Sequence, residues 1–407
     1  MRTLRKFRYF YKKFIRRLLN KVEKFEAFCA DIVYDRVKNP WARTITFPLL
    51  AFSKLFEKIV RLRYWLYKKN IFLSQPLGCP VIVIGNLTVG GTGKTPVVEK
   101  FARELSERGR KVAILSRGYG SKKEPKLKLF LRWITHGKEL PPRVVSNGEK
   151  TLLGSELAGD EPYMLAKNLP GVVVIVDKDR VKAGRYAIKK YGVNILILDD
   201  GFQYLPLRGH MNLLLIDQTN PFGNGKLLPR GILREPVDHL KRASYILLTK
   251  SDLNRGNFVE NVIHNFLPGK ELIKCCHKPK FLCSLADEND TLPIDSLRAK
   301  SVCIFSGIAM PDSFERFWET QGINIVYKKR FIDHHRFTEQ ELNCLYDVAL
   351  QRGANFAVTT EKDAVRMPRN YSYKLPTYFL KIGIEIIGGE KILDEAIMKF
   401  ISGKQLS

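Results

Sequence analysis

The sequence predicts an α/β protein, with a mostly parallel sheet covered by helices on both faces. It also predicts a smaller second α/β domain and a helical N-terminal region. Three observations lead to this class. Apolar runs alternate with helix-like segments from residue 80 onward, as parallel strands joined by crossover helices do. A glycine-rich loop joins the first run to the first helix, and the chain before residue 76 is basic and amphipathic.

The chain has 407 residues, which is more than one typical domain. We predict an N-terminal region at 1–75, a core at 76–268 and a smaller domain at 269–407. The net charge of +28, from 69 basic and 41 acidic residues, favours a polyanionic partner. Nucleic acid, anionic lipid and a phosphorylated substrate all qualify. A merely solvated basic surface is the alternative.

Seven cysteines are scattered without a CxxC pair, which favours free thiols in a reducing compartment. Cys275, Cys276, His277 and Cys283 form the one cluster. Their spacing matches no usual zinc pattern, so incidental thiols are the preferred interpretation over a metal site.

Residues 1–25 carry ten Lys or Arg, with apolar residues at helical spacing on the opposite face. This segment lacks the uncharged apolar core of a signal peptide. A basic amphipathic helix suits an anionic bilayer surface. An RNA-binding arm and a disordered basic tail are the alternatives.

A second such stretch covers residues 44–70, where charged residues interrupt an apolar sequence. No window reaches the roughly 18–20 uninterrupted apolar residues that span a bilayer. We predict an interfacial helix on the membrane, or a helix packed on the following domain, or both. The predicted apolar face consists of Leu49, Phe52, Phe56, Ile59, Leu62 and Leu66.

The stretch PVIVIGNLTVGGTGKTP, residues 80–96, reads as a buried strand, a glycine loop and a helix start. This is the phosphate-cradling arrangement of a P-loop, in which backbone N–H groups converge on phosphate oxygens. Lys94 would pair with the β/γ-phosphates, and the Thr95 hydroxyl would bind Mg²⁺. The standard spacing places glycine where this chain has Thr88. A tight turn that happens to contain Gly-Lys-Thr is the alternative. The predicted nucleotide-binding residues are Thr88, Val89, Gly90, Gly91, Thr92, Gly93, Lys94 and Thr95.

Strands and helices continue to alternate after this loop. The predicted strands lie in KVAILSRGYG (111–120), VVVIV (172–176), ILILDDGFQ (195–203), NLLLIDQ (212–218) and ASYILLTKSD (243–252), with a possible hairpin at 127–140. A helix begins near Asp160, and another covers 180–192. Beyond about residue 270 the pattern is strand, helix and strand, then a polar loop that contains two histidines and a final strand near 356–360.

Paired carboxylates follow one of the buried strands. Asp199 and Asp200 end the run ILILDD, where a P-loop protein needs a second magnesium-side carboxylate. An acidic pair that caps a turn is the alternative. Asp160 and Glu161 open a helix, where carboxylates also serve as plain N-caps.

Two further groups could take part in chemistry. His334 lies in Asp333-His334-His335, and a histidine beside an acid is a usable general base. A surface turn is the alternative. Arg234 could bind a phosphate with two hydrogen bonds, or pair with the adjacent Glu235.

Taken in order, these motifs resemble the tetraacyldisaccharide 4′-kinase family, from about Trp41 to the C-terminus. The resemblance rests on GNLTVGGTGKTP, SRGYG, GDEP, DDGFQ, FGNGKLLPRGILRE, DHH and TEKDAV. Thr88 within the glycine loop is typical of this family.

The resemblance implies roles for single residues. Lys94 and Thr95 would bind the ATP phosphates and Mg²⁺. Asp160 would be the general base in a dyad with His334. The further residues implied for binding the metal are Asp199, Asp200 and Glu161. The residues implied for binding the substrate are Arg117, Arg234 and Glu235.

The resemblance also implies the reaction and its place. ATP and Mg²⁺ would phosphorylate the 4′-hydroxyl of a tetraacylated disaccharide 1-phosphate, giving lipid IVA. The protein would be a monomer without nucleic acid, peripheral or monotopic on the cytoplasmic face of the bacterial inner membrane. If His334 comes from the second domain, the dyad would assemble only when the domains close.

The chain departs from the family pattern at several places. Tyr204 stands where the family commonly has His, and Arg230 and Ile232 replace the usual Ala and Pro. Residues 1–39 and part of 121–150 are additions. Tyr204 puts any histidine-dependent contact at that position in doubt.

Three other functions compete with this interpretation. LLTKSD at 247–252 imitates the guanine-reading motif of a P-loop GTPase, but Leu198 stands where such a GTPase has Asp. A basic nucleic-acid-binding ATPase fits the charge but lacks RNA-module signatures. A non-catalytic membrane scaffold is disfavoured because the catalytic positions are intact.

Overall fold

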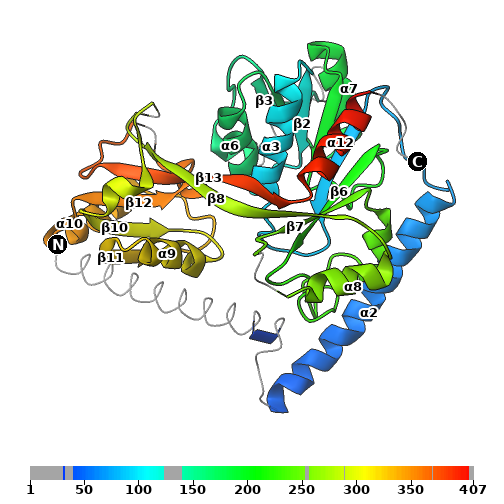
Figure 1. The fold of residues 1–407 in the computed structure, drawn as a ribbon, viewed down its shortest axis with the longest axis horizontal. Helices are drawn as coiled ribbons and strands as arrows, with labels where there is room; N and C mark the ends of the chain where they lie inside the picture. The colour runs from blue at the N-terminus through cyan, green and yellow to red at the C-terminus, as the bar shows by residue number, and fades with distance from the viewer. Residues whose placement is uncertain are drawn as a thin grey trace, which may run out of the picture. The chain divides into compact units, whose positions relative to one another are not determined.

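The computed structural model of the chain describes residues 31–32, 40–122, 140–252, 256–287, 289–368 and 370–402 (Figure 1). The predicted helix at 1–25 lies outside the described residues, as does all but Leu140 of the predicted hairpin. The chain forms two compact units. The first contains the described residues up to Phe72 together with Leu87–Gly90 and Asn220–Lys241, and the second contains the rest.

Every described strand belongs to one 13-stranded sheet in the second unit. Strand β1 (Val81–Asn86) lies between β5 (Ile195–Asp199) and β6 (Met211–Asp217) and is parallel to both. Beyond β5 follow β2 (Val112–Ser116), β4 (Val173–Val176) and the antiparallel β3 (Arg143–Asn147). Beyond β6 follow β7 (Tyr245–Thr249) and β8 (Leu272–Ser284), both parallel to their predecessors.

Two long strands carry the sheet into the C-terminal part of the chain (Figure 1). Strand β8 pairs with β7 through its first residues and with β13 (Thr377–Gly388) along most of its length. The β8–β13 pair is antiparallel, and β9 (Thr291–Leu292) also pairs with β8. The sheet then ends with the parallel strands β12 (Phe356–Thr360), β10 (Ser301–Ser306) and β11 (Asn324–Arg330).

Apolar helix faces cover both sides of the nucleotide-binding half of the sheet. Helices α3 (Lys94–Glu107), α6 (Asp160–Asn168) and α12 (Glu390–Ile401) share one core with the strands. Helix α7 (Arg180–Tyr191) packs on the opposite face. The prediction of a mostly parallel sheet with helices on both faces is confirmed.

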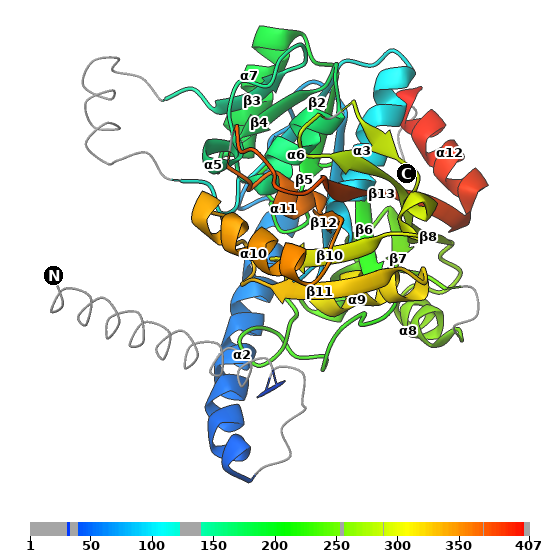
Figure 2. The ribbon, with the colours of Figure 1, turned by 90° about the vertical axis from the view of Figure 1, so that its left-hand side faces the viewer.

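Two helices pack in the same way on the C-terminal strands, as Figure 2 shows. Helix α9 (Pro311–Thr320) inserts Trp318 into a core with β10, β12 and β13. Helix α10 (Glu339–Gln351) packs Tyr346 into the core on the other face. Short helices complete the unit: α5 (Ser155–Ala158), α8 (Phe258–Phe266), α11 (Glu361–Ala364) and η2 (Ile294–Leu297).

The first unit is built on helix α2 (Pro40–Lys68), which confirms the predicted helix at 44–70. Ser53 donates a hydrogen bond of 2.8 Å to the Leu227 carbonyl, and Arg61 forms an ion pair of 2.8 Å with Asp238. Asp238 belongs to the 3₁₀ helix η1 (Val237–Arg242). Among the described residues, no helix has both the length and the apolar character needed to cross a bilayer.

Candidate active site

The turn from β1 into α3 needs glycine at Gly93. Gly93 caps α3 with φ 78° and ψ 25°, in the left-handed region. A Cβ added there would lie 2.7 Å from the His277 Nε2 atom. The predicted strand, loop and helix therefore occur in this order, and α3 begins at Lys94 with its first N–H groups available for an anion.

The earlier residues of the predicted loop, Thr88 to Gly90, belong to the first unit. The Val89 N–H donates a hydrogen bond of 2.8 Å to the Ile232 carbonyl. Thr88 forms an antiparallel bridge with Leu233. Within its own unit, this part of the loop is therefore fixed by the segment that carries Arg234 and Glu235.

Lys94 points toward the C-terminal ends of the central strands. Its Nζ donates a hydrogen bond of 3.2 Å to Asn86 Oδ1 and lies 3.5 Å from Asp200 Oδ1. Asp200 has φ 49°, which turns the chain sharply after β5. Thr95 is buried at the start of α3.

Asp199 ends β5 and is buried, and it accepts a hydrogen bond of 3.2 Å from Ser116 Oγ. Burial, together with the charges of Glu161 and Asp200, raises the pKa of Asp199 to about 7. A divalent cation would relieve this cost of ionisation, because opposite charge favours the carboxylate.

The donor set of these residues fits Mg²⁺. The described residues contain no cluster of three or more His, Cys, Asp or Glu with the geometry of a metal site. Mg²⁺ does not require one, since it is usually held by one or two carboxylates and substrate phosphates, with water in the other positions. Asp199, Asp200 and the Thr95 hydroxyl supply oxygen ligands of this kind.

Glu161 is the second residue of α6, and its carboxylate lies 2.5 Å from Lys362 Nζ. Burial acts to raise the pKa of Glu161, but the charge and hydrogen bond of Lys362 outweigh it and lower the pKa. Glu161 is thus ionised, and its negative charge interacts with Lys94 and with Asp199.

Asp160 opens α6, as predicted, and is buried. The preceding Gly159 has φ 91°, and a Cβ on it would lie 2.9 Å from the Tyr119 carbonyl oxygen. Only glycine therefore allows α6 to begin here. Asp160 Oδ2 lies 3.1 Å from His334 Nδ1, so the predicted dyad is in hydrogen-bond contact.

His334 is held by its own backbone. It has φ 60°, and its N–H donates to the Gly307 carbonyl at 3.2 Å and to Asp333 Oδ1 at 2.9 Å. The side chain is 45 % exposed, whereas that of Asp160 is 11 % exposed. The imidazole is therefore the accessible member of the dyad.

Two arginines beside the dyad were not predicted. Arg336 Nη2 lies 3.2 Å from Asp160 Oδ1, and Arg366 Nε lies 2.8 Å from Asp160 Oδ2. Arg366 is buried and also donates a hydrogen bond of 2.8 Å to the Gly307 carbonyl. Their positions in the sequence could have indicated them, because Arg336 directly follows the motif DHH and Arg366 directly follows the motif TEKDAV.

The contacts shift the two pKa values in opposite directions. Burial acts to raise the pKa of Asp160, but the hydrogen bond from His334 and the charges of Arg366 and Arg336 lower it overall. The hydrogen bond to Asp160 raises the pKa of His334, against the opposing effects of burial and Arg366. Asp160 is therefore a weak base, and His334 the stronger one.

The predicted substrate residues lie in different units. Arg117 is exposed and directly follows β2 in the second unit. Arg234 and Glu235 belong to the first unit. The Glu235 carboxylate is buried 2.6 Å from His239 Nδ1. Their roles toward a substrate stay predictions.

Tyr204 has a structural function in this chain. Its hydroxyl donates to Asp179 Oδ1 and accepts from the Arg180 N–H, both at 3.1 Å. Its ring lies 4.4 Å below the Arg180 guanidinium. Tyr204 therefore supports the start of α7, where Asp179 is the N-cap.

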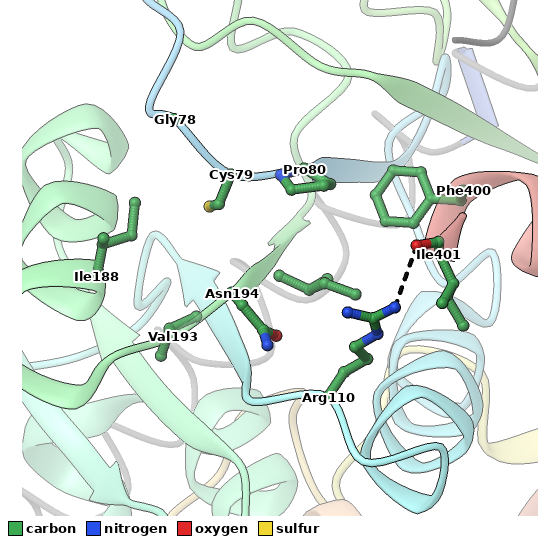
Figure 3. Close-up of a pocket in the computed structure, with 10 residues that line it drawn as sticks. Gly78, Cys79, Pro80, Arg110, Ile188, Val193, Asn194, Phe400 and Ile401 are labelled. Carbon is green, nitrogen blue, oxygen red and sulfur yellow. Dashed lines mark hydrogen bonds between the residues drawn. The ribbon is translucent and has the colours of Figure 1, made fainter. Parts of the chain in front are cut away.

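A cavity of about 350 Å³ lies at the N-terminal ends of the parallel strands (Figure 3). Its lining includes Cys79 and Pro80, just before β1, and Arg110, just before β2. Arg110 donates a hydrogen bond of 3.1 Å to the Ile401 carbonyl. These residues precede parallel strands, whereas Asp199 ends one. The cavity is thus separate from the acidic site. Of the cysteines in the predicted cluster, Cys275 and Cys276 are free thiols, and Cys283 is buried in β8.

A lysine at the start of the helix after the glycine loop, facing paired carboxylates at the ends of parallel strands, defines a P-loop phosphotransferase. A family model described as Tetraacyldisaccharide-1-P 4′-kinase matches residues 45–402. The chain belongs to this family, and it is accordingly an ATP-dependent kinase of lipid A biosynthesis.

Curated relatives and a solved structure agree. The tetraacyldisaccharide 4′-kinase of Desulfatibacillum aliphaticivorans is 37 % identical over 350 residues, 84 % of this chain and 89 % of that protein. The one of Anaeromyxobacter dehalogenans (strain 2CP-C) is 36 % identical over 86 % of this chain and 89 % of its own. The crystal structure of LpxK from Aquifex aeolicus in complex with ATP matches with a TM-score of 0.70 and 31 % identity, covering 88 % of this chain and 99 % of that one. The GTPase and nucleic-acid hypotheses are therefore not favoured.

Proposed function

We propose that this kinase transfers the γ-phosphate of ATP to the 4′-hydroxyl of tetraacyldisaccharide 1-phosphate, with His334 as the base that accepts the hydroxyl proton. The observation that carries the proposal is the hydrogen bond of 3.1 Å between His334 Nδ1 and Asp160 Oδ2. Asp160 is followed directly by Glu161, and the charge of Glu161 interacts with the charges of Lys94 and Asp200, which form an ion pair. Phosphate donor and hydroxyl acceptor would thus meet at one edge of the sheet.

This assignment refines the sequence-based expectation that Asp160 is the base. Asp160 is in contact with Arg336, Arg366 and His334. A carboxylate that already accepts these charged hydrogen bonds has little tendency to take another proton. We infer that Asp160 orients the imidazole and stabilises its protonated form, while His334 takes the proton.

On the donor side, Lys94 and the first N–H groups of α3 would bind the phosphates. Thr95, Asp199 and Asp200 would hold the metal ion. Mg²⁺, when bound, neutralises charge on the phosphates during transfer. Lys94 needs little rearrangement for its task, because Asn86 and Asp200 already orient its ammonium group.

We also propose that the first unit docks on an anionic membrane surface, the expected location being the cytoplasmic face of the inner membrane. The support lies in α2, which carries exposed apolar residues at helical spacing: Ile45, Phe52, Leu55, Ile59, Leu62 and Trp65. The N-terminal segment before α2 would add basic charge, since residues 1–25 contain ten Lys or Arg.

Further parts of the proposal follow the family resemblance. Arg117, Arg234 and Glu235 would contact the lipid substrate, and the chain would act as a monomer. Residues 269–407 would form the smaller domain, 76–268 the core and 1–75 the membrane-associating region. Since Asp160 and His334 are already in contact, we propose that the dyad does not need domain closure to form.

The test is incubation with ATP, Mg²⁺ and tetraacyldisaccharide 1-phosphate, with the 4′-phosphorylated product measured by mass spectrometry. We expect product from the wild type. Lys94→Ala should lose at least about 100-fold in kcat, because removing one charged transition-state contact costs about 3–4 kcal/mol. His334→Ala should lose about 100- to 10,000-fold in kcat, the usual contribution of a general base. Absence of product from the wild type would refute the assignment, and wild-type turnover by His334→Ala would refute the dyad.

A further inference from the structure

Two groups with opposite hydrogen-bonding character reach the same nitrogen of His334. Nδ1 lies 3.1 Å from Asp160 Oδ2 and 3.2 Å from Arg366 Nη2. An ionised carboxylate can only accept a hydrogen bond, and a guanidinium can only donate one. In a neutral imidazole, Nδ1 carries either a hydrogen or a lone pair, so it satisfies only one of these neighbours at a time.

The guanidinium of Arg366 is fixed where it is. Its side chain is 1 % exposed, and it donates to the Gly307 carbonyl at 2.8 Å and to Asp363 Oδ1 at 3.3 Å. Asp363 is itself fixed, because it accepts hydrogen bonds of 2.7 Å from Thr360 Oγ1 and 3.1 Å from the Gly307 N–H. Arg366 therefore cannot turn away from His334 without breaking several buried hydrogen bonds.

We propose that Arg366 is a positioning residue that sets the tautomer of His334. By donating to Nδ1, Arg366 favours the tautomer with its hydrogen on Nε2. Asp160 favours the other tautomer, with the hydrogen on Nδ1. The inference rests on the proposed function, because only the second tautomer leaves a lone pair on Nε2 for a substrate hydroxyl. Arg366 thus holds part of the enzyme in the form that cannot act as a base at Nε2.

The remaining groups that face the imidazole do not explain this competition. Asp333 Oδ2 lies 4.0 Å from Nε2, on the far side of the ring from Nδ1. The Tyr119 ring centroid lies 6.1 Å away. Arg336 contacts Asp160 at Oδ1, whereas the imidazole contacts Oδ2, and Asp363 contacts Arg366. Arg336 therefore provides a matched control, a second arginine on the same carboxylate.

The experiment reads the tautomer directly in the full-length protein, without nucleotide or lipid. The seven histidines are labelled with ¹⁵N, and the His334 signals are assigned through their loss in His334→Gln. Two-bond ¹H–¹⁵N spectra at about pH 9, where imidazoles are neutral, distinguish the tautomers. We expect both tautomers to contribute in the wild type. Arg366→Gln should move His334 to the Nδ1–H form, and Asp160→Asn should reduce that form, because an amide oxygen accepts a weaker hydrogen bond than a carboxylate does.

Arg336→Gln should leave the tautomer as in the wild type. Arg366→Lys provides the comparison if Arg366→Gln does not fold, because a single ammonium cannot reach Asp160 and His334 as the planar fork does. It should shift His334 in the same direction. An unchanged tautomer in the folded Arg366 variant would overturn the proposal, as would an equal change in Arg336→Gln. Either result leaves the His334→Ala activity test unaffected, so a failure of this inference is distinguishable from a failure of the proposed function.

Discussion

At the scale of single residues, Asp199 couples the proposed metal site to protein stability. Its pKa is raised to about 7 by burial and by the neighbouring carboxylates Glu161 and Asp200. The unfolded chain has an ordinary pKa of about 3.9 at this residue. Between these values the folded state binds more protons than the unfolded state, so the free energy of unfolding falls as the pH rises.

We therefore predict that the Tm of the metal-free protein decreases between about pH 5 and pH 7. Asp199→Asn should reduce this decrease, since it removes the titrating group. Excess Mg²⁺ with ATP should also reduce it in the wild type, because the cation stabilises the ionised carboxylate. The measurement is thermal unfolding across pH. His334 contributes a decrease of the same sign, because its pKa is raised, so the comparison with Asp199→Asn is what isolates Asp199. Identical slopes for both proteins would contradict the prediction.

Residue-scale prediction from sequence succeeded where a residue type and its local motif sufficed. The predicted positions of Lys94, Asp199 and Asp160 in the secondary structure are confirmed, because each opens or ends a recognisable helix or strand. Their roles stay predictions. Arg336 and Arg366 were missed. Their contacts with Asp160 join residues 176 and 206 positions apart, and no local pattern contains such a pairing.

At the scale of elements, α2 shows what amphipathic spacing can and cannot predict. Phe52, Ile59 and Leu62 of the predicted apolar face are exposed. Leu49, Phe56 and Leu66 are half-buried, whereas Leu55 and Trp65 join the exposed side. The sequence predicts the helix and its apolar character. It does not fix the orientation of the helix, because that depends on the 220–241 segment against which Ser53 and Arg61 pack.

A prediction at this scale concerns the exposed side of α2. Leu55→Asp should weaken co-sedimentation with phosphatidylglycerol-containing vesicles by about tenfold or more, because burying a leucine contributes about 1.5–3 kcal/mol. Leu55 is 55 % exposed, so the fold should be unaffected. Leu350→Asp on α10, where the leucine is 45 % exposed, is the matched control and should bind as the wild type does. Equal vesicle binding by all three proteins would exclude this side of α2 as the docking surface.

The strands were the most predictable elements. The runs before Asn86 and Asp199 are continuous and aliphatic, as strands buried on both faces are. The strands β8 and β13 were not predicted, and neither was their antiparallel pairing. It joins Ser284 to Tyr378, and strand pairing at such sequence separation leaves no mark on either segment alone.

At the scale of the whole chain, the two halves of the sheet depend on one another. Helix α12 follows β13 and returns to the nucleotide-binding half, where Leu393, Ile397 and Phe400 are buried with α3. The core that positions Lys94 is therefore completed by residues about 300 positions further along the chain.

We predict that Phe400→Ala lowers stability by about 3–5 kcal/mol and the Tm by several degrees, because it leaves a cavity in this core. Phe400 is 5 % exposed. Met398→Ala on the same helix is the control, since Met398 is 58 % exposed and its truncation should change the Tm little. Thermal unfolding followed by circular dichroism measures both. Equal Tm values for the two variants would show that α12 does not stabilise the core.

The position of α12 has a consequence for biosynthesis. A ribosome delivers Lys94 and Asp199 long before it delivers Phe400, yet the core that α3 shares with α6 and the strands stays incomplete until α12 is synthesised. The nascent chain must therefore hold an incomplete nucleotide-binding half in solution for most of its synthesis. The core of this half is therefore completed only once α12 has been synthesised.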